Sequence, residues 1–450
     1  MRYVSTRGDV ARVGFHDIVA GGLAPDGGLW VPETYPRLAA PATAAGEYPR
    51  LATDVMRAYA DDVESGPLEQ LVRAAYAVFD DPEVCPLRQL ADDLWLLELF
   101  HGPTLAFKDV ALQVLGRLLD DELRRRGTRA TILVATSGDT GAAAIAACVG
   151  RAALDIVVVH PAGRVSDVQR RQMTTVDAPN VHNLAIEGTF DDCQDLVKAL
   201  LADDALRQAH GLAAMNSINW TRVAAQTVYY EWAVRQLGRP AAFAVPSGNF
   251  GNAFAGWVAH RMGTAIERIV IGTNRNDLLF RWLAFGVLER REVVATVTPA
   301  IDIQVPSNLE RLLFELVGRD GDEVRSLMAR FRERGRVEAP RDPLLIGARL
   351  DDDQTRSVMA DVHAETDVVV DPHTAVAIGA ARACRARLPD GVPIVCLATA
   401  HPAKFPETVN EATGLTPDPP ASLEAALTRP ERYDTLPAEF DAVRAFLARL

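Results

Sequence analysis

Short apolar runs alternate with longer stretches of helical periodicity along most of the chain. Seven runs predict strands, because they are short, rich in aliphatic residues and bounded by turn residues: 94–99, 131–135, 156–159, 242–245, 268–272, 368–370 and 394–397. Strands separated by amphipathic helices are typical of an α/β fold whose sheets are largely parallel and buried on both faces. We therefore expect an α/β protein.

The first 92 residues follow a different pattern. Short helical stretches there are mixed with turn-rich segments such as GGLAPDGGLWVP at residues 21–32. We interpret residues 1–92 as a separate N-terminal domain. Residues 93–230 are then expected to form a smaller α/β domain and residues 231–450 a larger one.

Composition narrows the class of protein. Of the 450 residues, 48% are hydrophobic and 24% are charged, which is typical of a globular protein with more than one core. The longest apolar runs, such as residues 142–149, are far shorter than the roughly 18 residues that span a bilayer, and the first residues lead into no signal-type segment. We therefore expect a cytosolic protein without a membrane partner.

Charge and cysteine usage exclude other classes. The net charge of -13 would repel a phosphate backbone, which argues against nucleic acid as a partner. The five cysteines form no CxxC pair, so neither a disulfide framework nor a zinc site is predicted. We expect them to be buried as small apolar residues.

Two turns rich in Gly and Ser directly follow predicted strands. SGNFGN at residues 247–252 would direct backbone N–H groups toward one point at the start of a helix, which makes a phosphate cradle. An ordinary strand-to-helix turn is the alternative. TSGDTG at residues 136–141 has the same character, and its alternative is helix capping by Ser137 or Asp139. The turn at residues 247–252 matches neither the Rossmann pattern nor a Walker loop, so a nucleotide fold is disfavoured.

A lysine lies in the third candidate segment, ELFHGPTLAFKD at residues 98–109. Lys108 follows a Gly-Pro turn and opens an apolar helix. Most lysines are solvated surface residues. Against apolar neighbours, however, the amine of Lys108 would be desolvated and its pKa lowered, which Schiff-base formation requires.

Taken together, the motifs resemble those of threonine synthases of the bacterial and fungal type. HGPTLAFKD at residues 101–109 is followed by TSGDTG at 136–141, SGNFGN at 247–252 and TAHPAKF at 399–405. YVSTRG at residues 3–8 and GLAPDGGLWVP at 22–32 are similar to the start of that family. The resemblance covers nearly the whole chain, in order. It implies a fold-type II pyridoxal-phosphate enzyme with two open, mostly parallel sheets, flanking helices and an N-terminal domain.

The resemblance also implies cofactor-binding residues. Lys108 would hold pyridoxal 5'-phosphate as a Schiff base and later move protons. Asp139 would lie near the phenolic oxygen of the cofactor, where related enzymes often carry Asn, and Thr399 would meet the pyridine nitrogen. The phosphate would be cradled by Gly248, Asn249, Phe250, Gly251 and Asn252.

Substrate-binding residues follow from the same resemblance. The segment NSINWTR at residues 216–222 resembles the family's substrate-phosphate segment, with Arg222 as the cation and Asn216 and Ser217 as neutral donors. A surface ion pair is the alternative for the arginine. Thr136, Ser137 and Thr140 would receive the amino-acid carboxylate or share the phosphate. PSNLER at residues 306–311 and DPHTA at 371–375 also look like family motifs, without an assigned role.

The predicted reaction converts O-phospho-L-homoserine and water to L-threonine and phosphate. A threonine or serine dehydratase or a β-replacement synthase is the nearest alternative, since it shares the lysine and glycine loop but needs no second phosphate site. An inert metabolite-binding relative is the other alternative, against which the presence of Lys108 argues. The sequence leaves open whether the protein is a monomer or a homodimer.

Overall fold

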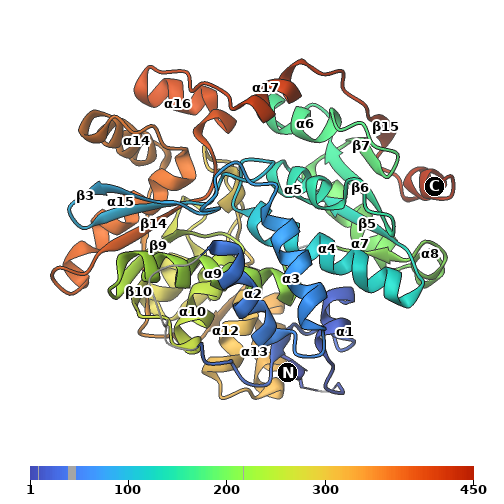
Figure 1. Cartoon of the computed structure of the whole chain (residues 1–450), viewed down its shortest axis with the longest axis horizontal. Coiled ribbons are helices and arrows are strands. Elements are labelled where there is room, and N and C mark those ends of the chain that lie inside the picture. The colour runs from blue at the N-terminus through green and yellow to red at the C-terminus, as the bar shows by residue number, and fades with distance from the viewer. Residues whose placement is uncertain (9, 39–46, 216) are drawn as a thin grey trace.

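A computed structural model describes residues 1–8, 10–38, 47–215 and 217–450. Two large sheets form the frame of the molecule (Figure 1). The five-stranded sheet is parallel throughout. Its strands lie in the order β15 (Asp434–Pro437), β7 (Val181–Glu187), β6 (Leu154–Pro161), β5 (Ala130–Ala135) and β8 (Leu212–Ala213).

The six-stranded sheet is parallel except at one edge. Its order is β13 (Leu345–Arg349), β10 (Ile266–Thr273), β9 (Ala241–Pro246), β14 (Ile394–Ala398), β4 (Leu94–Glu98) and β3 (Leu87–Ala91), with β3 antiparallel to β4. The predicted α/β fold with mostly parallel sheets is therefore confirmed. Residues 368–370, by contrast, form no strand. They run extended into α15 (Pro372–Cys384), and Val368 and Val370 are buried by packing in a core cluster rather than by pairing.

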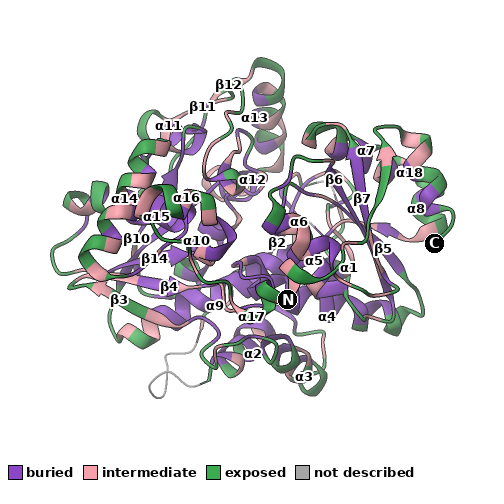
Figure 2. Ribbon diagram, turned by 90° about the horizontal axis from the view of Figure 1, so that it is seen from above, coloured by how far each residue is buried: buried purple, intermediate pink, exposed green. Residues whose placement is uncertain are grey.

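Helices cover both faces of each sheet, and Figure 2 shows the strands buried between them. Those that carry the site are α4 (Lys108–Arg126), α5 (Asp139–Cys148), α6 (Asp167–Thr174), α9 (Trp220–Leu237) and α10 (Gly251–Met262). Besides α15, the others after residue 92 are α7 (Phe190–Ala202), α8 (Asp204–His210), α11 (Leu278–Phe285), α12 (Leu309–Leu316), α13 (Gly321–Arg334), α14 (Asp352–Thr366), α16 (Pro406–Thr413), α17 (Ala421–Thr428) and α18 (Phe440–Leu447), with short 3₁₀ turns Pro299–Ile301, Arg385–Arg387 and η3 (Pro402–Lys404). A small hairpin pairs β11 (Val287–Glu289) with β12 (Arg336–Glu338).

The N-terminal segment packs closely on the rest of the chain. It contains β1 (Tyr3–Ser5) paired with β2 (Trp30–Pro32), and helices α1 (Phe15–Ala20), α2 (Tyr48–Tyr59) and α3 (Ser65–Tyr76). Helix α2 packs on α9, and α3 packs on α4. The rings of Tyr59 and Trp220 lie 5.7 Å apart, so this segment shares a hydrophobic core with the α/β region.

The sheets do not follow the expected bounds at residues 92 and 230. Strand β4 lies in the six-stranded sheet because it pairs with β14, and β15 returns to the five-stranded sheet to pair with β7. Each sheet is thus built from both sides of the bound at residue 230. As a division into folding units, the three segments remain a prediction.

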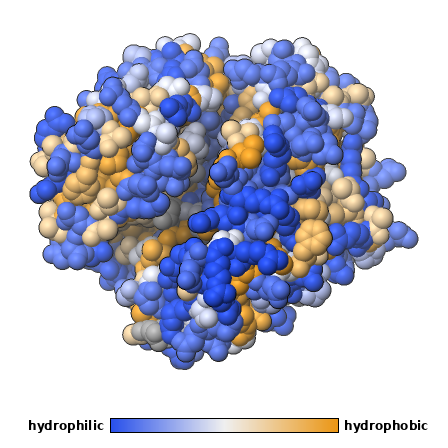
Figure 3. Space-filling view, turned by 180° about the vertical axis from the view of Figure 1, so that it is seen from behind, coloured by the Kyte–Doolittle hydropathy of each residue, from blue (hydrophilic) through white to orange (hydrophobic). Residues whose placement is uncertain are grey.

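Two further expectations concern burial. All five cysteines are buried and unpaired, as predicted. Among the described residues, no helix combines the length and apolar character that a bilayer crossing requires. Figure 3 shows a furrow that hollows one face of the molecule.

Candidate active site

Backbone hydrogen bonds join the segment just before Lys108 to residues 399–401, which are distant in the sequence. Phe107 donates its backbone N–H to the carbonyl of Thr399 at 2.9 Å, and His401 donates to the carbonyl of Leu105 at 3.1 Å. These bonds hold the start of α4 against the carboxyl end of β14. Leu105 adopts a positive φ of 60°, which turns the chain into the helix. The segments that carry Lys108 and Thr399 therefore lie side by side at the edge of the sheet where ligands bind in open α/β folds.

The side chain of Lys108 is nearly enclosed, with 11% of it exposed. Its Nζ lies 3.2 Å from Oδ2 of Asp139, at the start of α5. Burial lowers the pKa of Lys108, and this outweighs the opposing effect of Asp139. The nearby cations Lys404 and Arg222 lower that pKa further. A lysine whose proton is held weakly can act as a nucleophile and as a base.

Asp139 is bound from three directions. Besides Lys108, Nζ of Lys404 lies 2.9 Å from Oδ1, and Nε2 of Gln169 on α6 donates to the same oxygen at 2.9 Å. Burial alone would raise the pKa of Asp139, but the two lysines and Gln169 hold it well below its usual value. Asp139 is therefore a buried carboxylate rather than a neutral acid.

The turn at residues 247–252 has the geometry of an anion cradle. It follows β9, and α10 begins at Gly251 directly after Phe250, whose φ is 63°. A Cβ on Gly248 would lie 2.8 Å from a side-chain carbon of Ile303 and 2.9 Å from Cα of Ile301, so the close approach of these segments requires glycine.

Asn252 adds a free donor to this cradle. Its Oδ1 accepts from the hydroxyls of Tyr229 at 2.5 Å and Tyr230 at 2.8 Å, which fixes the orientation of the amide. Its Nδ2 is buried and has no partner within the described protein. A buried donor without an acceptor is costly unless a ligand satisfies it. The cradle therefore fits a bound anionic group such as the phosphate of a cofactor.

Arg222 is a second buried donor without a partner. It lies in the first turn of α9 and is 5% exposed, and its Nε and Nη1 make no hydrogen bond within the described protein. Burial lowers its pKa to about 10, so it stays protonated near pH 7. The alternative of a surface ion pair is wrong, because the residue is buried. A buried cation with two unsatisfied N–H groups indicates a site for an anion.

The turn at residues 136–141 is held by its own first residue. The hydroxyl of Thr136 accepts from the backbone N–H groups of Gly138 at 2.9 Å and Gly141 at 3.0 Å, and donates to the carbonyl of Gly138 at 3.1 Å. Thr136, not Ser137 or Asp139, thus caps the start of α5. Ser137 is exposed and Thr140 half-buried. Their role in substrate binding, like that of Thr136, stays a prediction.

Comparison with known proteins decides the family. Residues 83–400 match the family of pyridoxal-phosphate dependent enzymes, residues 2–76 the threonine synthase N terminus, and residues 374–447 the threonine synthase C-terminal region. Threonine synthase of Pseudomonas aeruginosa is 46% identical over 463 residues, which cover 100% of this chain and 98% of that protein. The chain belongs to the threonine synthase family.

Solved structures agree with this assignment. A pyridoxal-phosphate-bound threonine synthase from Brucella melitensis has a TM-score of 0.96 and 44% identity, covering 100% of this chain and 99% of that one. Threonine synthase from yeast has a TM-score of 0.94 and 34% identity over 100% and 99%. The fold-type II architecture and the pyridoxal-phosphate dependence predicted from the sequence are confirmed.

In this member of the threonine synthase family, PSNLER at residues 306–311 links the two predicted phosphate sites, a role that the sequence did not reveal. Asn308 donates its backbone N–H to the carbonyl of Asn249 at 3.1 Å and its Nδ2 to the carbonyl of Ser217 at 3.1 Å. The hydroxyl of Ser307 donates to Oδ1 of Asn249 at 3.2 Å and lies 2.9 Å from that of Ser217. Asn216, predicted to bind substrate, lies outside the described residues.

The motif DPHTA at residues 371–375 anchors the segment that covers Gly248. Asp371 caps α15 by accepting from the backbone N–H groups of His373 and Thr374. Nδ1 of His373 lies 2.9 Å from Oδ1 of Asp371, while its Nε2 accepts from the backbone of Ala300 at 3.2 Å. The motif thus holds Ala300 in place beside Gly248 of the cradle.

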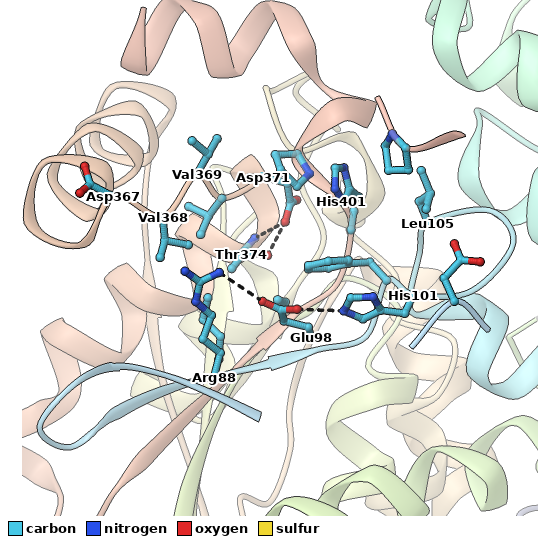
Figure 4. Close-up of a pocket in the computed structure, with 18 residues that line it drawn as sticks. Arg88, Glu98, His101, Leu105, Asp367, Val368, Val369, Asp371, Thr374 and His401 are labelled. Atoms are coloured by element: carbon cyan, nitrogen blue, oxygen red, sulfur yellow. Dashed lines mark hydrogen bonds and ion pairs between the residues drawn. The ribbon is translucent and has the colours of Figure 1, made fainter. Parts of the chain in front are cut away.

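The segment of residues 398–402 also lines a cavity of about 450 Å³. Ala398 and Ala400 line it but Thr399 does not. Figure 4 shows Glu98 in this cavity between Arg88 and His101. Oε2 of Glu98 lies 2.8 Å from Nε2 of His101. Among the described residues, Lys108 does not line this cavity.

Proposed function

We propose that this chain converts O-phospho-L-homoserine and water to L-threonine and phosphate. One observation carries the choice of substrate: the buried guanidinium of Arg222 has two unpaired N–H groups and lies close enough to Lys108 to lower its pKa. An arginine presents parallel donors that match a phosphate group. With its carboxylate at the turn of residues 136–141, an unphosphorylated amino acid would leave these donors unsatisfied, at a cost of about 1–3 kcal/mol or more.

The residues that would hold pyridoxal phosphate are those of the cradle and its surroundings. The backbone of Gly248, Asn249, Phe250, Gly251 and Asn252 and the free Nδ2 of Asn252 would bind its phosphate. Lys108 would form the covalent bond, Asp139 would lie by the phenolic oxygen, and Thr399 by the ring nitrogen. The buried position of all three side chains supports these assignments.

Lys108 is the proposed acid and base. In the net reaction, the C–O bond at Cγ of the substrate breaks, phosphate leaves, and the oxygen of water bonds to Cβ while Cγ becomes a methyl group. Pyridoxal phosphate, when bound, stabilises the negative charge that develops at Cα and Cβ. Lys108, when its amine is free, would take up and return the protons at these carbons. Proton transfer by a positioned group contributes about 10²–10⁴-fold in rate.

The remaining substrate groups have candidate partners. Ser217 and Asn216 would assist Arg222 at the phosphate, and Thr136, Ser137 and Thr140 would receive the carboxylate or share the phosphate. The start of α5 at the turn of residues 136–141 supports an anion there, since helix N-termini attract negative charge. A cytosolic location belongs to the same proposal.

The test is a stoichiometric product assay. The purified chain, supplied with pyridoxal phosphate and O-phospho-L-homoserine, should release phosphate and L-threonine in equal amounts, with oxygen from labelled water in the β-hydroxyl group. A dehydratase would instead form a 2-oxo acid and ammonia from serine or threonine. Release of 2-oxo acid without threonine, or no turnover at all, would contradict the proposal.

A further inference from the structure

Lysine is rare in this chain. Three of the 47 basic residues are lysines, namely Lys108, Lys198 and Lys404, and all the others are arginines. Lys198 is exposed on α7 and pairs with Asp195 at 3.0 Å. The other two are buried, and both contact the same carboxylate, that of Asp139. Two of the three lysines of the chain therefore place their amines at one buried carboxylate.

Lys404 is held more tightly than Lys108. Its side chain is fully buried at the end of η3. Its Nζ lies 2.9 Å from Oδ1 of Asp139 and donates to the carbonyl of Thr104 at 2.6 Å. Lys108 contacts the other carboxylate oxygen, Oδ2, at 3.2 Å. Asp139 thus bridges two ammonium groups, with one on each oxygen.

The two lysines cannot have equivalent roles if Lys108 reacts. A lysine that forms a covalent bond or gives up its proton no longer neutralises Asp139 in the same way. A buried carboxylate without a cation is strongly disfavoured. With Lys404 in place, Asp139 keeps a partner throughout, and the bond from Lys404 to Thr104 fixes that partner on the same loop that leads to Lys108.

We propose that Lys404 is a positioning residue that remains an ammonium, holds the Asp139 carboxylate in place and so leaves Lys108 free to lose its proton and react. This inference rests on the proposed role of Lys108 as the reacting amine and is independent of the substrate.

The surrounding charges are consistent with different roles for the two lysines, with Lys404 as the fixed cation and Lys108 as the reacting amine. Lys108 is faced by Asp139 from α5, Lys404 from η3 and Arg222 from α9. Asp109, the next residue of α4, is close enough to Lys404 to interact electrostatically. Burial raises the pKa of Asp109 to about 6, while that of Asp139 is held low. Asp139 is therefore the firm anionic partner of Lys404. Removing the charge of Lys404 should bind the proton of Lys108 more tightly.

The first experiment uses the wild-type sequence, because three lysines give three signals in a protein labelled with ¹³C at the lysine ε-carbon. The full chain, freed of cofactor, would be titrated by NMR, with Lys198→Arg and Lys404→Arg each assigning one signal by its loss. The signal of Lys404 should stay that of an ammonium over the whole range in which Lys108 loses its proton. A Lys404 signal that titrates with or before that of Lys108 would overturn the proposal.

The second experiment measures acetylation of Lys108 by mass spectrometry in the same cofactor-free chain. Lys404→Met should slow the reaction of Lys108 at pH 8, by about tenfold for each unit by which its pKa rises. Lys404→Arg should keep most of the wild-type rate, and Lys198→Met is the matched control that should keep all of it. An unchanged rate in folded Lys404→Met would also overturn the proposal, and if that variant does not fold, the NMR titration decides. Neither measurement uses phosphohomoserine, so an incorrect substrate would not affect them.

Discussion

Phe107 and Thr399 are joined by a backbone hydrogen bond of 2.9 Å, from the N–H of the former to the carbonyl of the latter. The bond lies one residue before Lys108, so it joins the segment that carries Lys108 to the segment that follows β14 at one edge of the sheet. Because binding sites in open α/β sheets lie at this edge, the position of Lys108 is set by backbone contacts and not by its own side chain.

Replacement of Lys108 by alanine should abolish turnover and the covalent bond to pyridoxal phosphate, because no other lysine of the described site is placed to replace it: Lys404 is fully buried and bound to Asp139 and Thr104. Borohydride reduction followed by mass spectrometry measures the bond. Lys198→Ala is the control and should behave as wild type. If the Lys108→Ala protein still carries reduced cofactor in wild-type amount, the assignment of the lysine is wrong.

Gly248→Ala should weaken binding of pyridoxal phosphate about tenfold to a hundredfold. The new Cβ would lie 2.9 Å from Cα of Ile301, and forcing apart well-packed segments costs about 1–3 kcal/mol. A fluorescence titration with the cofactor measures the change. Gly66→Ala is the matched control, since nothing lies within 4 Å of its Cβ position. Equal affinity for pyridoxal phosphate in the two variants would show that the cradle does not bind the cofactor.

The free energy of unfolding should depend on pH between about pH 4 and pH 6 because Asp109 titrates there in the folded protein. Burial raises its pKa from 3.8 to about 6, although Thr104 donates to both carboxylate oxygens at 2.8 Å. The folded state then binds more protons than the unfolded state within this range, so Asp109 stabilises the fold as pH falls from 6 to 4.

Asp109→Asn lacks this contribution. Its deficit in the free energy of unfolding relative to wild type should therefore grow, by up to about 3 kcal/mol, as pH is lowered from 7 to 4. Urea unfolding at several pH values measures it, and other titrating groups cancel in the difference between the two proteins. A deficit that stays constant or shrinks would show that burial does not raise the pKa of Asp109 in the folded protein.

Much of the fold could be predicted from the sequence, because parallel strands buried on both faces leave short aliphatic runs. Six of the seven predicted runs overlap strands. The strand predicted at residues 368–370 is wrong, because an apolar run that packs against a sheet face has the same composition as one that pairs within the sheet. Sheet membership also escaped prediction, because the pairing of β15 with β7 joins segments that lie far apart in the sequence.

The site was predictable where it lies in local motifs and not where it depends on tertiary contacts. The lysine, the cradle and the arginine each stand in a recognisable string. The partners of Asp139 do not, because Gln169 and Lys404 reach it from separate elements. Lys404 was visible in TAHPAKF, but only its full burial and its distance from Asp139 reveal what it does. Likewise, Thr136 caps α5 because the turn folds back on its hydroxyl.

The central claim is that the unpaired guanidinium of Arg222 receives the substrate phosphate. Arg222→Ala should raise the KM for O-phospho-L-homoserine about tenfold to a hundredfold, since loss of a charge-assisted hydrogen bond costs about 1.5–3 kcal/mol. Arg222→Lys should recover part of this loss, because an ammonium keeps the charge but not the planar fork. Both variants should keep the wild-type spectrum of bound pyridoxal phosphate.

The decisive measurement compares kcat/KM of wild type and Arg222→Ala for phosphohomoserine and for any slow side reaction with serine or threonine. We predict a large loss for the phosphorylated substrate and almost none for the unphosphorylated ones, which have no phosphate to lose. Equal losses on both kinds of substrate would contradict the account, because Arg222 would then support the structure of the site and not recognise its substrate.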